Sequence, residues 1–243
     1  MIRNTRVYTP QKLVCGESIY LEQQASHHLI KVLRSKPGAH ITLFNGDGHD
    51  YQSIFTMIES KTAAISINKK ILVENESPIN ITLLQGLSRS DRMDATIQKS
   101  VELGVNQIIP VLCERSNFSI KADRRNKKNE HWKKIIISAC EQSGRAIIPK
   151  LSDIISLNDA VSFANDCEKL ILSTGTTQSL TSIKKPNNIC VLIGPEGGFS
   201  DEELSVAAKN NFKEVGFGRR ILRTETAGPA VITAMQTLWG DLK

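Results

Sequence analysis

The amino-acid sequence predicts an α/β protein with two domains: a small N-terminal β-barrel and a larger domain built on a mostly parallel sheet. The length of 243 residues leaves room for one large domain or two modest ones. Short strand-like segments fill residues 1–72, whereas strands alternate with helices over residues 73–243. Glu, Asn, Ser and Pro interrupt the periodic pattern over 71–80, and we expect the linker there.

The first region predicts short strands and one helix. Strands are expected at 41–44 and 51–58, because a turn rich in Gly, Asn and Asp separates them. The alternating run 64–68 predicts a further half-buried strand. A short helix is expected over 26–33, where apolar side chains share one face. This combination favours a small barrel.

The second region predicts an alternation of strands and helices. Strands are expected at 81–87, 107–113, 169–173, 189–193 and 214–217. Helices are expected through Met93 and Val101 up to a cap at Gly104, through Trp132 and Cys140, from Ser200, and over about 226–239. Ser200 and Glu203 match a capping box. Because proline is tolerated only in the first helical turn, the last helix is expected to begin just before Pro229.

Composition excludes several classes of protein. With 40% hydrophobic and 23% charged residues, the chain does not resemble a disordered protein. No apolar run reaches the roughly 20 residues of a membrane-spanning helix, and the N-terminus lacks the apolar stretch of a signal peptide. The five cysteines form no C-x-x-C pair and the five histidines have no ligand spacing, so no metal is expected. We expect a cytoplasmic protein without a membrane partner.

The net charge of +6 is concentrated in one segment. Residues 121–134 hold seven Lys/Arg against two acidic residues, which leaves the rest of the chain close to neutral. A local basic patch is typical of polyanion binding, although a solvated loop that leads into a helix explains it equally well. The candidate phosphate ligands are Arg124, Arg125, Lys127, Lys128 and Lys133.

A glycine-rich loop follows the expected strand at 189–193. Three glycines within Gly194–Gly198 allow the backbone to approach a ligand closely, and such loops bind ligands at the carboxyl ends of parallel strands. Neither G-x-G-x-x-G nor G-x-x-x-x-G-K-[ST] is present, which argues against a dinucleotide or P-loop site. Glu196 disfavours an anionic phosphate and favours a ligand with a cationic or donor-rich part.

Three further segments carry charged side chains at expected helix ends. Residues 217–230 place Arg223 and Glu225 before the last helix, where positive charge opposes the helix dipole. Residues 91–104 place Arg92 in a first helical turn, and residues 140–145 bring Glu141 and Arg145 to a helix end. Each of the last two segments alone is more typical of a capped helix end than of a site.

Together these segments resemble one family. They read LLQGLSRSDRMDATIQKSVELGV, EHWKKIIISACEQSGRAIIP, LIGPEGGFSDEEL and FGRRILRTETA, in the order and spacing of the ribosomal RNA small subunit methyltransferase E family. The N-terminal HHLIKVLRSKPGAHITLFNGDG is similar to that family's RNA-binding barrel, so the resemblance covers nearly the whole chain. Gly228-Pro229 departs from the family pattern, which more often has Ala or Leu there, and this puts the start of the last helix in question.

The resemblance implies fold, cofactor and partners. It implies a SPOUT-class C-terminal domain with a trefoil knot that binds S-adenosyl-L-methionine, a PUA-like barrel, a homodimer, and 16S rRNA as the partner. It also implies a reaction, the methylation of N3 of a uridine. The implied cofactor residues lie in three loops: Leu172, Ser173, Thr174, Gly175; Gly194, Pro195, Glu196, Gly197, Gly198, Phe199; Ile221, Leu222, Thr224.

The implied chemistry needs no metal, because the cofactor already carries an activated methyl group. The protein must align N3 with the methyl group and remove the N3 proton. A guanidinium would stabilise the charge that spreads onto the uracil oxygens, and Arg92, Arg145 and Arg223 are the candidates. Glu141 and Glu225 are candidate bases, with solvent or a phosphate oxygen left open.

Other functions remain as alternatives. The same knotted fold could methylate tRNA or 23S rRNA, and a non-enzymatic rRNA-binding assembly factor could retain it. Intact Gly194–Gly198 and Arg223–Glu225 argue against lost catalysis. A nucleotide hydrolase is disfavoured by the missing phosphate loop.

Overall fold

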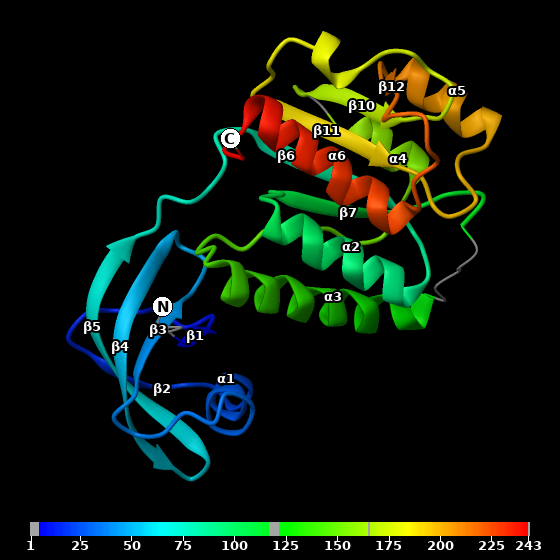
Figure 1. Ribbon diagram of the computed structural model, residues 1–243. Coiled ribbons are helices and arrows are strands. Elements are labelled where there is room, and N and C mark those ends of the chain that lie inside the picture. The colour runs from blue at the N-terminus through cyan, green and yellow to red at the C-terminus, as the bar shows by residue number, and fades with distance from the viewer. Residues whose placement is uncertain (1–4, 117–121, 165, 243) are drawn as a thin grey trace. The chain divides into compact units, whose positions relative to one another are not determined.

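The computed structural model describes residues 5–116, 122–164 and 166–242, and it contains two compact units (Figure 1). The first unit comprises the chain up to Glu76 together with Cys140–Ile148. The second comprises Ser77–Ala139 and the chain from Pro149 onward. The first unit is therefore discontinuous in sequence, because the end of one long helix and the loop after it group with the N-terminal strands.

The first unit contains a five-stranded sheet with the order β1-β3-β4-β5-β2. Its strands are β1 (Thr5–Tyr8), β2 (Ser18–Tyr20), β3 (His40–Phe44), β4 (His49–Glu59) and β5 (Thr62–Leu72). β1 pairs in parallel with β3, and the other pairs are antiparallel. The three expected strands of this region are confirmed in β3, β4 and β5, which curve around the core of the unit (Figure 1).

The expected helix of the first unit is present but irregular. It begins as α1 (Gln23–His27) and continues as the π-helical turn η1 (His28–Val32). The backbone N–H of Leu33 donates to the carbonyl of His28 at 2.9 Å, the i→i+5 bond of a π-helix. Leu29 is fully buried in the apolar core that the sheet encloses, together with Val7, Ile41, Leu43 and Phe55. The helix thus closes the core of this unit.

The second unit is built on a parallel sheet with the order β12-β10-β11-β6-β7-β8, and β9 also pairs with β7. The strands are β6 (Asn80–Gly86), β7 (Gln107–Leu112), β8 (Lys150–Leu151), β9 (Ile155–Ser156), β10 (Glu168–Leu172), β11 (Asn188–Ile193) and β12 (Lys213–Val215). All of these pairs are parallel, which confirms the predicted sheet type. β6 and β11 read as continuous apolar runs because both of their faces are covered.

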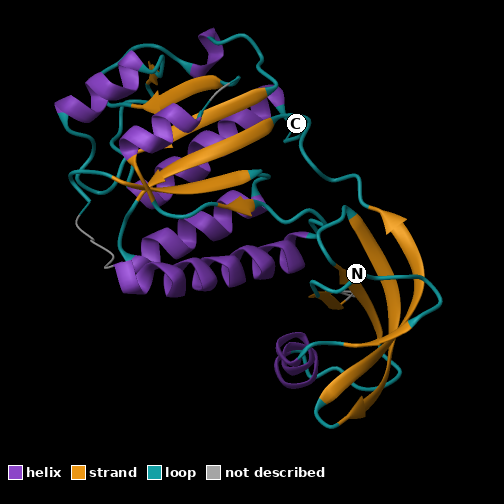
Figure 2. Ribbon diagram, turned by 180° about the vertical axis from the view of Figure 1, so that it is seen from behind, coloured by secondary structure: helices purple, strands orange, loops and turns teal. Residues whose placement is uncertain are grey.

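Helices cover both faces of this sheet (Figures 1 and 2). The helices of the unit are α2 (Ser90–Glu102), α3 (Ala122–Ser143, whose last turn groups with the first unit), α4 (Leu157–Phe163), the 3-10 turn η2 (Leu180–Ser182), α5 (Asp201–Lys209) and α6 (Thr224–Trp239). α2 and α6 pack together over one face, while α4 and α5 contact each other on the other. Ile109, Val161 and Leu192 are buried between the sheet and the second helix pair.

The start of the last helix differs from the prediction. α6 begins at Thr224, so Pro229 lies inside it, beyond the first turn. The expectation that the helix begins just before Pro229 is wrong, because the side chains before it, Thr224 and Ala227, are buried and their packing fixes the helical turn. Burial outweighs the roughly 3 kcal/mol by which an interior proline disfavours a helix.

Within the described ranges, no helix is both long enough and apolar enough to cross a bilayer. The same residues hold no group of three or more His, Cys, Asp or Glu side chains that could bind a metal ion.

Candidate functional site

Two loops follow neighbouring strands at the carboxyl edge of the parallel sheet. β10 leads into Ser173–Gly175, and β11 leads into the glycine-rich loop Gly194–Phe199. Because both strands run in the same direction, these loops emerge side by side, where open α/β sheets bind ligands. The backbone N–H of Ser173 donates to the carbonyl of Val215 at 3.1 Å, which joins the end of β12 to the same edge.

Two glycines allow this edge to pack closely. A Cβ atom on Gly86 would lie 2.6 Å from the backbone nitrogen of Pro195, and one on Gly197 would lie 2.7 Å from the carbonyl oxygen of Arg115. Real Cβ atoms do not approach backbone so closely. The glycine-rich loop is thus pressed between the end of β6 and the segment that follows β7, and it keeps a defined backbone course.

A buried hydrogen-bond chain connects the glycine-rich loop to α6. The Thr224 hydroxyl donates to the carbonyl of Gly194 at 2.7 Å, and the Gln85 amide donates to that hydroxyl at 2.9 Å. Gln85 is fully buried at the end of β6, and Thr224 is the first residue of α6. The chain fixes the start of α6 against two strand ends.

The predicted capping box at the start of α5 is confirmed. The backbone N–H of Glu203 donates to the Ser200 hydroxyl, while the Glu203 carboxylate accepts the Ser200 N–H at 3.0 Å. The same carboxylate accepts the backbone N–H of Glu114 at 2.8 Å. Arg115 donates to the carbonyl of Phe199 at 3.0 Å. The end of the glycine-rich loop is thus attached both to α5 and to residues 114–115.

Charged side chains from three segments meet beside this loop. One carboxylate oxygen of Glu196 accepts the backbone N–H of Arg89 at 3.0 Å and a guanidinium N–H of Arg92 at 3.2 Å. The Arg92 Nε also lies 3.8 Å from the Glu225 carboxylate. Arg223 approaches the same carboxylate at 4.0 Å, and its side chain is 78% exposed. The order Glu196, Arg92, Glu225, Arg223 alternates negative and positive charge; we call these four residues the charged cluster.

Two atoms of the charged cluster are buried without a partner. The second carboxylate oxygens of Glu196 and Glu225 are shielded from solvent and accept no hydrogen bond from the part of the chain that the structure describes. Buried polar atoms are normally satisfied, and the exceptions concentrate at functional sites. These two oxygens can accept protons or hydrogen bonds from a bound molecule.

A cavity of about 560 Å³ lies between the segment after β12, the η2 segment and α6. Leu180, Phe217, Leu222 and Leu238 give it mainly apolar walls. Gly218 at its rim has a φ of +74°, and a Cβ there would meet only open space. The backbone N–H of Gly216 donates to the carbonyl of Gln178 at 2.8 Å, which holds two of the walls together. The cavity has the size and character of a small-molecule site.

The predicted cofactor residues divide into three groups in the structure. Gly194–Phe199 and Thr224 share the hydrogen-bonded strand edge, and Leu222 lines the cavity. Leu172 ends β10, and Gly175 has a φ of +106° with open space beside it. Ile221 is 85% exposed, which is unusual for an apolar side chain.

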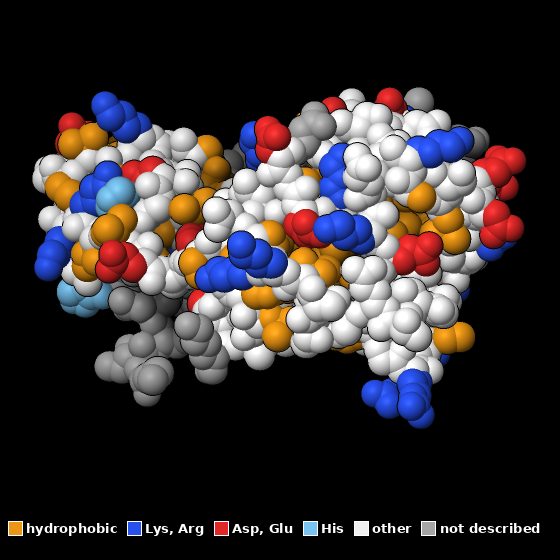
Figure 3. Space-filling model, turned by 90° about the horizontal axis from the view of Figure 1, so that it is seen from above, with side chains coloured by type: hydrophobic (Ala, Val, Ile, Leu, Met, Phe, Trp, Pro, Cys, Tyr) orange, Lys and Arg blue, Asp and Glu red, His pale blue; other side chains and the backbone are white. Residues whose placement is uncertain are grey.

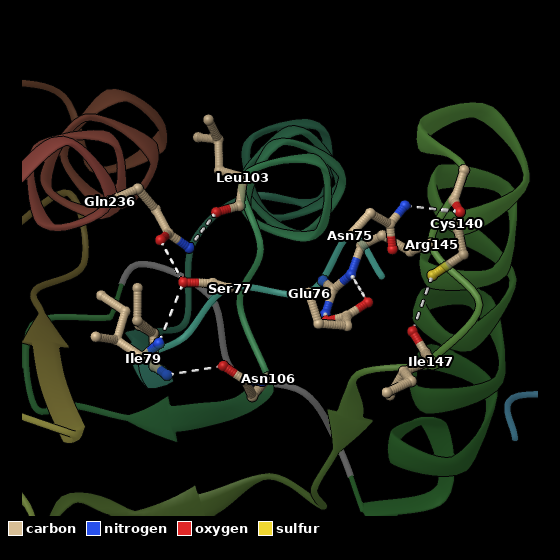
Figure 4. Close-up of polar contacts among 12 residues, drawn as sticks. Asn75, Glu76, Ser77, Ile79, Leu103, Asn106, Cys140, Arg145, Ile147 and Gln236 are labelled. Carbon is tan, nitrogen blue, oxygen red and sulfur yellow. Dashed lines mark hydrogen bonds and ion pairs between the residues drawn. The ribbon is translucent and has the colours of Figure 1, made fainter. Parts of the chain in front are cut away.

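Two predicted catalytic residues group with the first unit, whereas the charged cluster belongs to the second. Glu141 and Arg145 belong to the first unit, where the Tyr8 N–H donates to Glu141 at 3.0 Å and His28 lies 3.7 Å from the same carboxylate. Arg145 is buried and pairs with Glu76 through both its Nε, at 3.0 Å, and an Nη (Figure 4). Burial raises the pKa of Glu141, an effect opposed by the Tyr8 N–H, His28 and Arg6. The contacts are those of structural anchors for the end of α3.

The predicted basic segment forms the first turns of α3, with Lys121 outside the described residues. Arg124, Lys127 and Lys128 line a second cavity of about 340 Å³. Arg125 and Lys133 lie on the same helix but do not line it, and Lys133 pairs with Glu130 at 2.8 Å. Sequence reasoning missed the other lining residues, Ser90, Asp94 and His131, because only the packing of α2 against α3 brings them to the basic side chains.

Figure 3 shows one face of the molecule, seen from above. Lys/Arg and Asp/Glu side chains occur there as small separate groups among apolar and other side chains. The positive excess of the sequence therefore does not form one continuous basic surface on this face.

Comparison with known proteins connects this site to RNA methyltransferases. The family described as an RNA methyltransferase domain matches residues 75–236, and the one described as an RNA methyltransferase PUA domain matches residues 21–68. The ribosomal RNA small subunit methyltransferase E of Buchnera aphidicola from Acyrthosiphon pisum is 36% identical over 98% of this chain and 95% of its own length. That of Bacillus subtilis is 26% identical over 93% of each.

Two solved structures are similar over almost the whole chain. The ribosomal RNA small subunit methyltransferase E of Neisseria gonorrhoeae, bound to S-adenosylmethionine, is 42% identical with a TM-score of 0.93 and covers 99% of this chain and 100% of that one. A protein of Legionella pneumophila, solved with the cofactor SAM bound, is 37% identical with a TM-score of 0.97 and the same coverage. These similarities confirm the predicted α/β SPOUT fold with an N-terminal PUA-like β domain. The chain belongs to the ribosomal RNA small subunit methyltransferase E family.

Proposed function

We propose that the protein transfers a methyl group from S-adenosyl-L-methionine to N3 of a uridine in 16S rRNA of the small ribosomal subunit. The observation that carries the proposal is the charged cluster beside the glycine-rich loop, because it places two arginines and two buried carboxylate oxygens at the strand edge. Full-length similarity to relatives named for this substrate, one of them bound to the cofactor, supports it.

The residues present fit this cofactor. The 560 Å³ cavity lies within the range of roughly 300–1,000 Å³ for small-molecule sites, and its apolar walls suit an adenine ring. Leu222 and Phe217 would contact the ring. Backbone groups of Gly194–Phe199 and Ile221–Thr224 are the proposed ligands of the rest of the cofactor. When bound, S-adenosylmethionine supplies an activated methyl group on a sulfonium.

The charged cluster can hold and stabilise the uridine. Arg92 is held between Glu196 and Glu225, so its guanidinium has a fixed position before substrate binds. The exposed guanidinium of Arg223 can turn toward a uracil carbonyl and stabilise the charge that develops when N3 loses its proton. Glu225 carries a buried oxygen without a partner among the described residues, and we assign it the N3 proton. Glu141 and Arg145 serve the first unit instead.

RNA is expected to bind along the basic turns of α3 and on the N-terminal sheet. Arg124, Arg125, Lys127, Lys128 and Lys133 are the proposed phosphate ligands. A homodimer is the proposed assembly, supported by apolar side chains that stay exposed: Ile221 at 85% and Leu238 on α6 at 43%. Pairing of two copies would cover them.

The function is tested by replacing Arg223 with alanine. Loss of the guanidinium should lower kcat for methylation at least about a hundredfold, because charge stabilisation in a transition state is worth several kcal/mol. Affinity for S-adenosylmethionine, measured by titration without RNA, should stay the same, and so should the thermal unfolding midpoint. Arg219→Ala in the same exposed loop removes the same charge outside the charged cluster and is the control. Full activity of the Arg223→Ala variant would show that Arg223 does not stabilise the charge on the uracil.

The non-enzymatic alternative makes a different prediction. An assembly factor that keeps only the fold would bind 16S rRNA without binding S-adenosylmethionine. A titration of the wild-type protein with the cofactor therefore separates the two: no detectable binding would favour the alternative.

A further inference from the structure

The second cavity, between α2 and α3, is a built site with a strong charge bias. It measures about 340 Å³, and Ser90, Asp94, Arg124, Lys127, Lys128 and His131 line it. We call it the α2–α3 pocket. Three basic side chains face one acidic side chain, and the two helices that carry them lie side by side in both ribbon views (Figures 1 and 2). The pocket thus favours an anion.

Asp94 is the one acidic residue of this lining, and each of its carboxylate oxygens already contacts another side chain. One carboxylate oxygen of Asp94 accepts the indole N–H of Trp132 at 3.1 Å, and the other lies 2.7 Å from the His131 ring nitrogen. Trp132 is 1% exposed, so this bond is protected from water. Asp94 therefore holds α3 against α2 through contacts with two side chains of α3.

The start of α2 adds one hydroxyl group to the lining of the pocket. The Ser90 hydroxyl contacts the Lys128 ammonium group, and the N-cap residue Arg89 has no side-chain bond to the first turn. The Ser90 hydroxyl and the three basic side chains together make a set of donors that suits phosphate oxygens.

The α2–α3 pocket adjoins the proposed methylation site along the chain. Ser90 lines the pocket, whereas the backbone N–H of its neighbour Arg89 donates to Glu196 of the charged cluster at 3.0 Å. Arg92, in the same first turn of α2 as Ser90, pairs with the same carboxylate. An anion in the pocket would therefore contact the helical turn that also carries Arg92.

We propose that the α2–α3 pocket holds one specific phosphodiester of the RNA, within one or two nucleotides of the target uridine. This inference rests on the proposed function and sharpens it, because it separates one pocket contact from the general attraction of the basic helix. The volume accommodates a phosphate group together with part of its ribose. The bound phosphodiester fixes the register of the strand and so the distance of the uracil from Arg92.

The test compares two double variants that each remove two positive charges. Arg124→Ser/Lys127→Ser changes two exposed side chains that line the pocket, and Lys184→Ser/Lys185→Ser changes two exposed lysines in another loop of the same unit. Affinity for a 16S rRNA fragment that contains the target uridine is measured across salt concentrations. The pocket variant should bind about tenfold more weakly or worse, with the salt slope reduced by about one, as expected for one lost phosphate contact. The control should match the wild type.

A modified RNA locates the contact. A single methylphosphonate, which is uncharged, is placed in turn at each linkage within two nucleotides of the uridine. At one linkage it should weaken wild-type binding about tenfold and leave the pocket variant unaffected, because the two changes remove the same interaction. Additive losses at every linkage, or equal losses in the pocket and control variants, would overturn the proposal.

Two further measurements keep the outcomes distinct. The affinity for S-adenosylmethionine without RNA should be the same in all variants. A wild-type protein that does not bind S-adenosylmethionine would contradict the proposed function, but not the proposal that the pocket binds a phosphodiester. Inorganic phosphate should weaken the binding of RNA to the wild type, and it should weaken the binding of RNA to the pocket variant less. Binding of inorganic phosphate that leaves RNA affinity unchanged would show an adventitious anion site only and would contradict the proposal.

Discussion

Glu196 is the residue on which the proposed site depends most. Its carboxylate joins the glycine-rich loop to the first turn of α2 through the Arg89 N–H, and it holds the Arg92 guanidinium at 3.2 Å. The sequence alone indicated a role in cofactor binding, because only the loop around it was visible. The contacts of Glu196 are those of a positioning residue that acts through Arg92.

Replacing Glu196 with glutamine tests this role. The amide keeps an oxygen for the Arg89 N–H but loses the charge that holds Arg92, so kcat should fall about tenfold or more. KM for RNA and affinity for S-adenosylmethionine should change little, and Glu196→Asp should restore part of the rate. Steady-state kinetics and cofactor titration check both expectations. Weaker cofactor binding at an unchanged kcat would contradict this role and would show that Glu196 acts in cofactor binding.

At the scale of elements, packing around the carboxyl edge decides where helices begin. The capping box of α5 could be predicted because Ser200 and Glu203 are three residues apart, and local spacing is all that such a box requires. The start of α6 could not be predicted in this way. It depends on hydrogen bonds of the buried Thr224 with Gln85 and Gly194, which lie far from it in the sequence. Short elements such as α4, β8 and β9 carry too few residues to show a period.

The cap of α5 makes a stability prediction. Ser200→Ala removes the acceptor for the Glu203 N–H, and loss of an N-cap side chain typically lowers the free energy of unfolding by about 1 kcal/mol. Ser205→Ala, at an exposed position inside the same helix, should be neutral or slightly stabilising because alanine favours helix. Urea unfolding of both variants measures the difference. Equal stabilities would show that the cap contributes nothing.

At the scale of the whole molecule, the fold is discontinuous in a way that spacing could not reveal. Glu141 lies in the last turn of α3 and Arg145 lies just after that helix, yet both residues group with the N-terminal sheet. Arg145 is 4% exposed and bonded to Glu76, a partner 69 residues away in the chain. The sequence offered these helix-end charges as catalytic candidates but could not show their partners, because spacing along the chain does not reveal contacts between distant residues. The periodic pattern of apolar residues cannot predict a trefoil knot either, and the knot is expected only from the family resemblance.

The partly buried Glu141 gives the stability of the first unit a pH dependence. Its pKa is raised above the usual value of 4.5, chiefly by burial. Between the unfolded and folded pKa values the folded protein binds more protons than the unfolded chain, so the free energy of unfolding falls as pH rises through this window. Glu141→Gln keeps an acceptor for the Tyr8 N–H and removes the titration. The stability of the variant relative to wild type should therefore rise as pH increases above about 4.5, measured by urea unfolding. A difference that is constant with pH would contradict the burial of the charge.

Mass spectrometry of 16S rRNA shows whether this chain methylates N3 of a uridine in that RNA. 16S rRNA from a strain that lacks the protein is incubated with the purified wild-type protein and S-adenosylmethionine, then digested to nucleosides and mapped. We expect one new N3-methyluridine at a single position, present with the wild type and strongly reduced with Arg223→Ala. An unmodified 16S rRNA, from a protein that binds both cofactor and RNA, would contradict it.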